Sequence, residues 1–150
     1  MNTQKTLNII SRSFIGLSAA SLLSVSLMAF SNPQSVMNLV QVQLNNTDAL
    51  SSIRGVYGGV GLTLVISLVY LLVKDVQKGL AFLCLLWGLY AASRLITTFA
   101  DGALGAFGKQ WLIIESVFFC IATLLFVLRK RHIATQIEQH MMPLTHKRTA

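Results

Sequence analysis

Three ionisable side chains, Arg54, Arg94 and Glu115, interrupt stretches of sequence that are otherwise apolar. Each belongs to a different apolar stretch, and in helices rising 1.5 Å per residue all three would lie within about 8 Å of the same membrane boundary. An ion in a low-dielectric interior is stable only if a partner compensates its desolvation. We therefore predict that Glu115 pairs with Arg94, with Arg54 or with both.

This polar layer has two interpretations. It is either a structural clamp that holds helices in register without a ligand, or the wall of an outward-facing cavity that binds an anionic or polar small ligand. The candidates for the lining of such a cavity are Tyr57, Tyr90, Trp87 and Trp111, although an interfacial anchor is the preferred role for Trp111. A Glu between two Arg leaves one positive charge, which Asp101 would neutralise if it followed Arg94 on the same helical face. Arg54 lies so near the end of its stretch that it could instead extend to the membrane interface.

Other catalytic chemistries find no support in the sequence. Cys84 and Cys120 are isolated within apolar stretches, where cysteine behaves as a small hydrophobe. The three histidines follow the last apolar stretch, so none can ligate a metal or haem inside the membrane. We predict no catalytic residue, metal or cofactor, and we favour a binding or accessory module over an enzyme. A small transporter component and a lipid- or quinone-directed enzyme that uses Glu115 as a proton acceptor remain alternatives.

The elements that must position the layer follow from the composition, which is 54% hydrophobic and 11% charged. Soluble domains are about 45–50% apolar and about 25% charged. Four apolar stretches, at about 13–30, 53–73, 79–99 and 111–128, would each span about 27–32 Å as a helix, close to the hydrocarbon thickness of about 30 Å. The prediction is an all-α polytopic membrane protein, with a four-helix transmembrane bundle over 1–132 and a basic tail over 133–150.

The cations predict the orientation of this bundle. The net charge is +7, from 12 Lys and Arg against 5 Asp and Glu. Most of the cations flank the apolar stretches on one side, which places both termini and the loop at 74–78 in the cytoplasm. The sequence has no basic face interleaved with aromatic residues, so we expect no nucleic-acid partner.

The ends of the apolar stretches carry further signals. Lys5 and Arg12 before the first stretch resemble a secretory signal, but the stretch exceeds the usual length of about 7–15 residues, which favours an uncleaved helix. Asn32-Pro33 should end this helix, and a short surface helix is preferred over a strand for the apolar residues up to Leu44. The glycine-rich loop after Asp101 indicates a tight turn with positive φ.

Small residues at helical spacing predict close helix packing. They are Gly55-x-x-x-Gly59, Gly88-x-x-x-Ala92 and the neighbouring Gly58 and Gly61. We interpret them as contacts within the bundle, with a homodimer face as the alternative. The expected partners are membrane lipid and, at this face, a membrane protein or a second copy of the chain.

The run Ser52-Ile53-Arg54-Gly55-Val56-Tyr57-Gly58-Gly59, together with Arg94, Asp101-Gly102 and Glu115, resembles the domain of unknown function 4345 family over residues 50–128. The resemblance implies a small four-helix protein of the bacterial inner membrane and supplies no activity. Where that family commonly has an acidic residue, two positions before the arginine, this chain has Ser52. The departure makes Glu115 the more important counter-ion.

Overall fold

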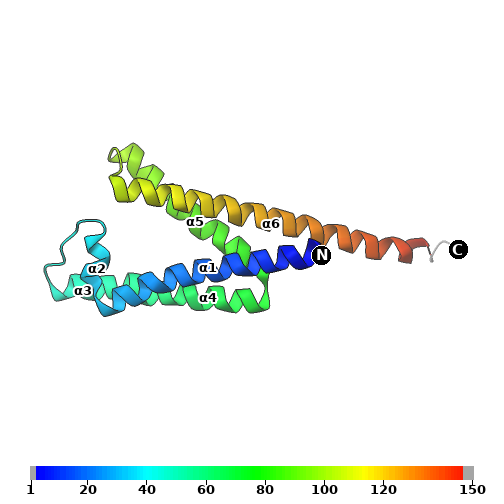
Figure 1. Cartoon of the computed structure of the whole chain (residues 1–150), viewed down its shortest axis with the longest axis horizontal. Coiled ribbons are helices and arrows are strands. Elements are labelled where there is room, and N and C mark those ends of the chain that lie inside the picture. Colours follow the sequence, from blue (N-terminus) through cyan, green and yellow to red (C-terminus); the bar gives the residue numbers. More distant parts are fainter. Residues whose placement is uncertain (1–2, 147–150) are drawn as a thin grey trace.

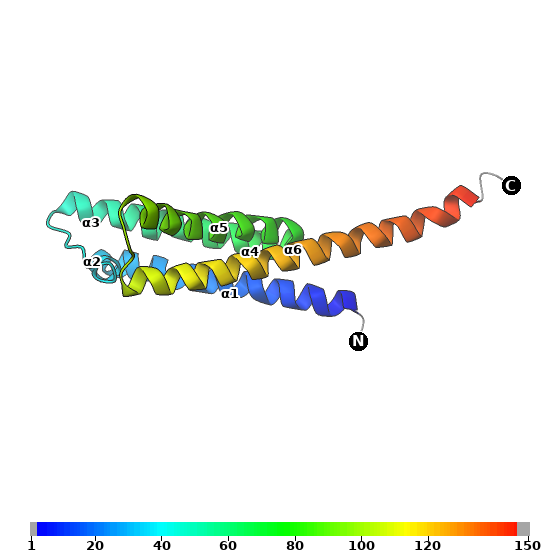
Figure 2. The ribbon, with the colours of Figure 1, turned by 90° about the horizontal axis from the view of Figure 1, so that it is seen from above.

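The fold consists of two antiparallel helical hairpins that lie side by side (Figure 1). The computed structural model describes residues 3–146, with side chains for 4–135. The first hairpin pairs α1 with α4, and the second pairs α5 with α6, as the two views agree (Figures 1 and 2). The long helices are α1 (Thr3–Ser31), α4 (Gly61–Lys74), α5 (Val76–Ala100) and α6 (Ala106–His146).

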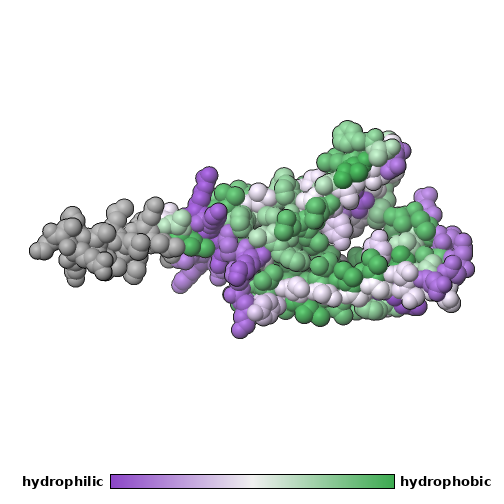
Figure 3. Space-filling model, turned by 180° about the vertical axis from the view of Figure 1, so that it is seen from behind, coloured by the Kyte–Doolittle hydropathy of each residue, from purple (hydrophilic) through white to green (hydrophobic). Residues whose placement is uncertain are grey.

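Four helical segments are long and apolar enough to cross a membrane: Gln4–Ser31, Thr47–Lys74, Val76–Ala100 and Ala106–Thr135. The predicted all-α architecture with four candidate spans is therefore confirmed. Each segment extends beyond the apolar stretch that predicted it, because polar residues continue the helix after the hydrocarbon-matched part has ended. Figure 3 shows the resulting apolar body between polar side chains at its two ends.

The second span begins at Thr47 rather than near residue 53 and has three parts. They are α3 (Thr47–Ile53), a π-helical segment η1 (Arg54–Val60), and α4. The early start has a local cause, because the Asn46 side chain accepts a hydrogen bond of 2.7 Å from the Ala49 N–H and caps the first turn. A π-helical segment widens the helix and is frequent at functional sites.

The segment between the first two spans folds differently from the expectation. Helix α1 ends at Ser31, where the Asn32 side chain accepts from the Gln34 N–H and Pro33 opens α2 (Pro33–Asn38). The short helix is therefore present, but it is earlier and shorter than the apolar spacing indicates. The chain then turns through Gln41, whose φ of 60° breaks the helical path. In the loop after α5, Gly102 has the positive φ of a tight turn, at 104°.

The apolar core fills the half of the bundle that contains the N-terminus and the α4–α5 connection, which we call the N-terminal end. Ile15, Leu68, Leu80 and Leu83 are completely buried there. Asp75 begins α5 at this end by accepting a hydrogen bond of 3.0 Å from the Lys78 N–H. That bond holds the pKa of the Asp75 carboxyl below its usual range, and the Lys78 side chain adds to the effect.

In the first hairpin, two arginines donate hydrogen bonds to carbonyl groups near the C-terminal ends of α1 and α4. Arg12 of α1 donates from Nη2 to the Leu72 carbonyl oxygen near the end of α4, at 2.9 Å. Arg54 of η1 donates from Nε to the Phe30 carbonyl oxygen near the end of α1, at 3.3 Å. Carbonyls in the last turn of a helix lack intrahelical partners and carry partial negative charge. Each helix therefore supplies the cation that the other helix end favours.

The predicted small-residue contacts divide into two groups. A methyl group added at Gly58 or Gly88 would lie 3.1 Å from the ring of Phe30 or Phe119, and one at Gly61 would meet the Ser26 hydroxyl. The same addition at Gly55 or Gly59 meets nothing within 4 Å. Gly55 and Gly59 therefore do not bring two helices of the chain into close contact, contrary to our interpretation. Ala92 is half-buried on α5.

Candidate functional site

Arg94 of α5 and Glu115 of α6 form a bidentate ion pair. Arg94 Nε lies 2.6 Å from Glu115 Oε2, and Nη2 donates to Oε1 at 2.9 Å. The exposed fraction is 4% for the Glu115 side chain and 24% for that of Arg94. Two parallel N–H···O bonds fix both the distance and the plane of the pair. The prediction that Glu115 pairs with Arg94 is confirmed.

The other charged residues predicted for the polar layer, Arg54 and Asp101, do not pair with Arg94 or Glu115. Arg54 is exposed and donates to the Phe30 carbonyl. Asp101 is exposed just beyond the end of α5. Within the side chains described, the ion pairs are Arg94 with Glu115 and Lys78 with Asp75. The surroundings of Glu115 are therefore charge-balanced, rather than positive as two arginines around one glutamate would make them.

A cavity of about 280 Å³ adjoins the ion pair. It lies between the two hairpins toward the end of the bundle that contains α2 and α3, which we call the α2–α3 end. Figure 3 shows an opening between the hairpins in this region. Residues of both hairpins and of the segment after α1 contribute to the lining, which comprises Ser21, Leu22 and Val25 of α1, Val36 and Met37 of α2, Leu39, Val40, Tyr57 of η1, Trp87, Tyr90 and Arg94 of α5, and Phe107, Trp111 and Glu115 of α6.

Unused hydrogen-bond donors face this cavity. Arg94 has five N–H groups and spends two on Glu115, and no described residue accepts from the remaining three. The hydroxyls of Tyr57 and Tyr90 likewise have no hydrogen-bond partner among residues 4–135. The Trp87 Nε1–H, in contrast, donates to the buried Ser18 Oγ at 3.3 Å. The cavity can therefore donate hydrogen bonds from a guanidinium and two phenols.

Aromatic rings form much of the remaining wall. Trp87 contacts Tyr90 at a ring-centroid distance of 6.0 Å, and Phe107 contacts Trp111 at the same distance. The chain has two tryptophans, and both line the cavity. Of these aromatic residues, sequence reasoning had named Tyr57, Trp87, Tyr90 and Trp111 for a lining and had missed Phe107. The residues from α2 and the following turn have the apolar spacing of a surface helix, and that spacing does not indicate which part of the bundle they contact.

Toward the N-terminal end, the cavity is closed by the apolar core. Ile15, Leu80 and Leu83 are completely buried below it. Within residues 4–135, no group of three His, Cys, Asp or Glu side chains could hold a metal ion. The arrangement is that of a pocket with one open end, an aromatic wall and one neutralised ion pair.

The chain belongs to the family described as a domain of unknown function, DUF4345. The family's sequence model matches residues 10–126, from within α1 to within α6, and so reaches all four candidate spans. The match extends the resemblance that Arg54, Tyr57-Gly58-Gly59, Arg94 and Glu115 indicate. No curated protein and no solved structure matches the chain.

Proposed function

We propose that this member of the DUF4345 family is a binding or accessory protein of the bacterial inner membrane, and that its cavity holds a neutral amphipathic small molecule. The observation that carries the proposal is an aromatic cavity in which the two charged lining residues, Arg94 and Glu115, neutralise each other. Arg94 still has N–H groups that can donate to a ligand. Pockets that are mostly apolar with a few convergent polar groups are typical ligand sites.

Charge balance favours a neutral ligand over an anionic one. An anion that bound Arg94 would compete with a carboxylate already held at 2.6 Å and would leave the buried Glu115 charge without its partner. A carbonyl or hydroxyl oxygen can accept from the unused Arg94 and tyrosine donors without that loss. The earlier expectation of an anionic ligand required Arg54 in the same layer, and Arg54 caps α1 instead.

The size of the cavity limits what enters it. An engineered cavity of about 150 Å³ holds a benzene ring. A volume of about 280 Å³ therefore accommodates one substituted ring or a head group of similar size. A longer apolar tail would leave through the opening, past the exposed side chains of Leu39 and Val40. A quinone with its isoprenoid tail, or a neutral lipid head with its acyl chain, has this form.

The distribution of cations supports an outward-facing cavity. Lys5, Arg12, Lys74, Lys78 and Arg129 belong to the N-terminal end, opposite the cavity. The positive-inside rule then assigns the N-terminal end to the cytoplasm and the α2–α3 end to the periplasm. A proton-accepting role for Glu115 is less favoured, because Arg94 holds both of its oxygens.

The tryptophans in the lining provide a direct test. A short-chain neutral quinone titrated into the protein in detergent should quench the fluorescence of Trp87 and Trp111 saturably. Ser21→Phe places a ring in the cavity and should abolish the saturable component, since the Ser21 hydroxyl bonds only within its own helix. Ser24→Phe is the matched control, because Ser24 is an exposed α1 residue outside the lining and should titrate like the wild type.

Two results would contradict the proposal. Equal quenching of both phenylalanine variants and the wild type would mean that the quinone reaches the tryptophans only through the detergent. A fatty-acid carboxylate that binds more tightly than the neutral quinone would show that the ion pair opens to an anion.

A further inference from the structure

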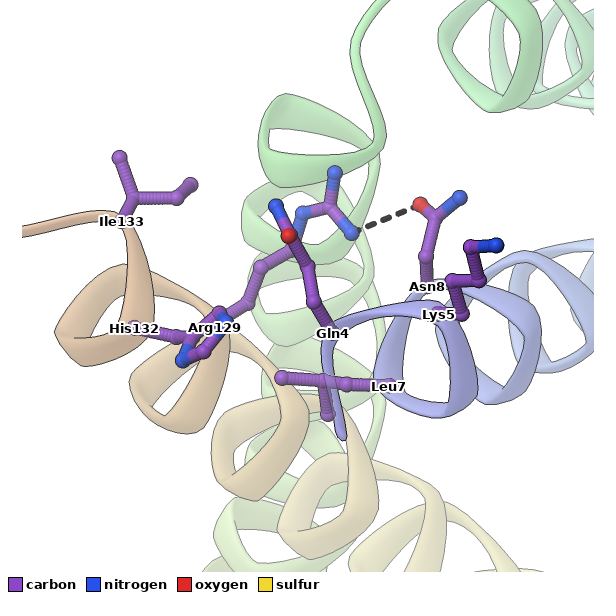
Figure 4. A pocket seen from close by; sticks show the side chains of 7 residues that line it. All are labelled: Gln4, Lys5, Leu7, Asn8, Arg129, His132 and Ile133. Carbon is purple, nitrogen blue, oxygen red and sulfur yellow. Dashed lines mark hydrogen bonds between the residues drawn. The ribbon is translucent and has the colours of Figure 1, made fainter. Parts of the chain in front are cut away.

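A second cavity lies at the N-terminal end, between the beginning of α1 and the part of α6 that leaves the bundle (Figure 4). Its volume is about 260 Å³. Lys5, Asn8, Arg129 and His132 supply polar groups to its lining, and Leu7 and Ile133 supply apolar surface. It is far from the aromatic cavity, and no step of the proposed ligand binding uses it.

The charges of this second cavity are not balanced. Its lining includes Lys5 and Arg129 and no acidic residue. The acidic residue of the nearby α4–α5 connection, Asp75, lies 3.3 Å from Lys78 and so already has a cation. Arg12, the other cation on this part of α1, donates to the Leu72 carbonyl. The excess positive charge therefore belongs to the cavity itself.

Two buried nitrogens of the lining lack hydrogen-bond partners. Arg129 Nη1 donates to the Asn8 side-chain oxygen at 2.8 Å, the dashed line in Figure 4, but Arg129 Nε has no partner. His132 Nε2, one turn further along α6, is also buried and without a partner. Buried polar groups are nearly always satisfied, so the Arg129 Nε–H, which can only donate, indicates a missing acceptor. The His132 Nε2 would donate to the same kind of group when it carries a proton.

We propose that this cavity binds a phosphate group, supplied by the headgroup of an anionic phospholipid. A guanidinium fork matches phosphate oxygens, and Lys5 adds a second cation. The location fits a headgroup, because the cavity lies where the apolar body meets the polar side chains of the N-terminal end (Figure 3). Basic pockets between membrane helices recognise phospholipid headgroups in this way. Leu7 and Ile133 then contact the first carbons of the lipid.

The experiment compares two arginines of one short segment. The full chain in neutral detergent is mixed with phosphatidylglycerol or with phosphatidylcholine, and native mass spectrometry counts the bound lipids. Arg129→Gln should weaken phosphatidylglycerol binding about fivefold or more, the change that corresponds to one lost basic contact. The control, Arg131→Gln, removes the same charge from an exposed residue outside the lining and should bind like the wild type.

A second variant keeps the test valid if Arg129→Gln fails to fold. Arg129→Lys retains the charge but loses the planar fork, so binding should again fall while Arg131→Lys leaves it unchanged. Inorganic phosphate identifies the source of the group: displacement of the lipid by millimolar phosphate assigns the cavity to a free anion, and persistence of the lipid assigns it to the headgroup. Equal losses at positions 129 and 131, or equal binding of phosphatidylcholine, would overturn the proposal.

Discussion

Among residues 4–135, Glu115 is the one charged residue that is buried, and its negative charge is compensated by Arg94. Removing one partner of a buried ion pair leaves an uncompensated charge, whereas replacing both partners is often nearly neutral. Arg94→Gln should therefore lower the free energy of unfolding by about 3 kcal/mol, at the lower end of that effect because Arg94 is partly open to the cavity. The double variant Arg94→Gln/Glu115→Gln should recover most of the loss.

Denaturant unfolding in detergent micelles measures these changes. Arg54→Gln serves as the comparison, because it removes a cation from an exposed position that holds one helix carbonyl. It should cost about 1 kcal/mol, the usual effect of losing one cap. A double variant that loses the sum of its two single losses would show that Arg94 and Glu115 stabilise the fold independently.

Helical spacing alone was not enough to predict which arginine would pair with Glu115. Burying Glu115 without a partner would be unfavourable, and this argument was sufficient to predict that it pairs with an arginine. Spacing gives depth along a helix but not the direction in which Arg54 and Arg94 point across the bundle. The choice between them depended on the free Phe30 carbonyl that appears where Asn32-Pro33 ends α1.

At the scale of the elements, the contact between α1 and the second span depends on Gly61. Gly61→Ala should destabilise the fold by about 1–3 kcal/mol, because the new methyl group meets the completely buried Ser26, whose hydroxyl is held by the Leu22 carbonyl. Gly59→Ala, two residues earlier, meets nothing and should be neutral or stabilising by up to about 1 kcal/mol. Thermal unfolding followed by circular dichroism measures both.

The pair Ser26→Ala/Gly61→Ala extends this comparison. Removal of the hydroxyl should restore part of the stability lost in Gly61→Ala. If Gly59→Ala is the more damaging single variant, then the face with Gly55 and Gly59 is covered by something other than this chain, as the homodimer alternative requires.

The number and type of the long helices were predictable, and their ends were not. The length of an apolar stretch identifies a hydrocarbon-matched segment, but the Asn46 side chain caps the second span and starts it about a turn and a half earlier. The π-helical segment at Arg54–Val60 and the turn at Gln41 have no periodic signature. Both supply or position lining residues, so the aromatic cavity could not be assembled from the sequence.

At the scale of the whole molecule, the cations predict which side of the membrane each end faces. In a chain without Cys84 and Cys120, Asn45→Cys in the α2–α3 connection should react with a membrane-impermeant maleimide in intact cells. Thr135→Cys, near the N-terminal end, should react only after permeabilisation. Both positions are exposed and uncharged, so neither change alters the charge distribution that sets the orientation.

The reverse labelling pattern would place the aromatic cavity on the cytoplasmic side. The fold and the ion pair would be unaffected, but the cations would then lie on the outer side, against the positive-inside rule. Labelling of both cysteines in intact cells would indicate two orientations in one population.

The polar bonds between the hairpins are unevenly placed. Arg129 to Asn8 joins them at the N-terminal end, and Trp87 to Ser18 joins them midway. From Trp87 to the α2–α3 end, no hydrogen bond connects one hairpin to the other among residues 4–135. Each hairpin keeps its own internal bonds, so the width of the entrance is set by van der Waals contact alone. A bulkier ligand can therefore enter if one hairpin tilts as a rigid body at this end, because the tilt breaks no hydrogen bond there between the hairpins.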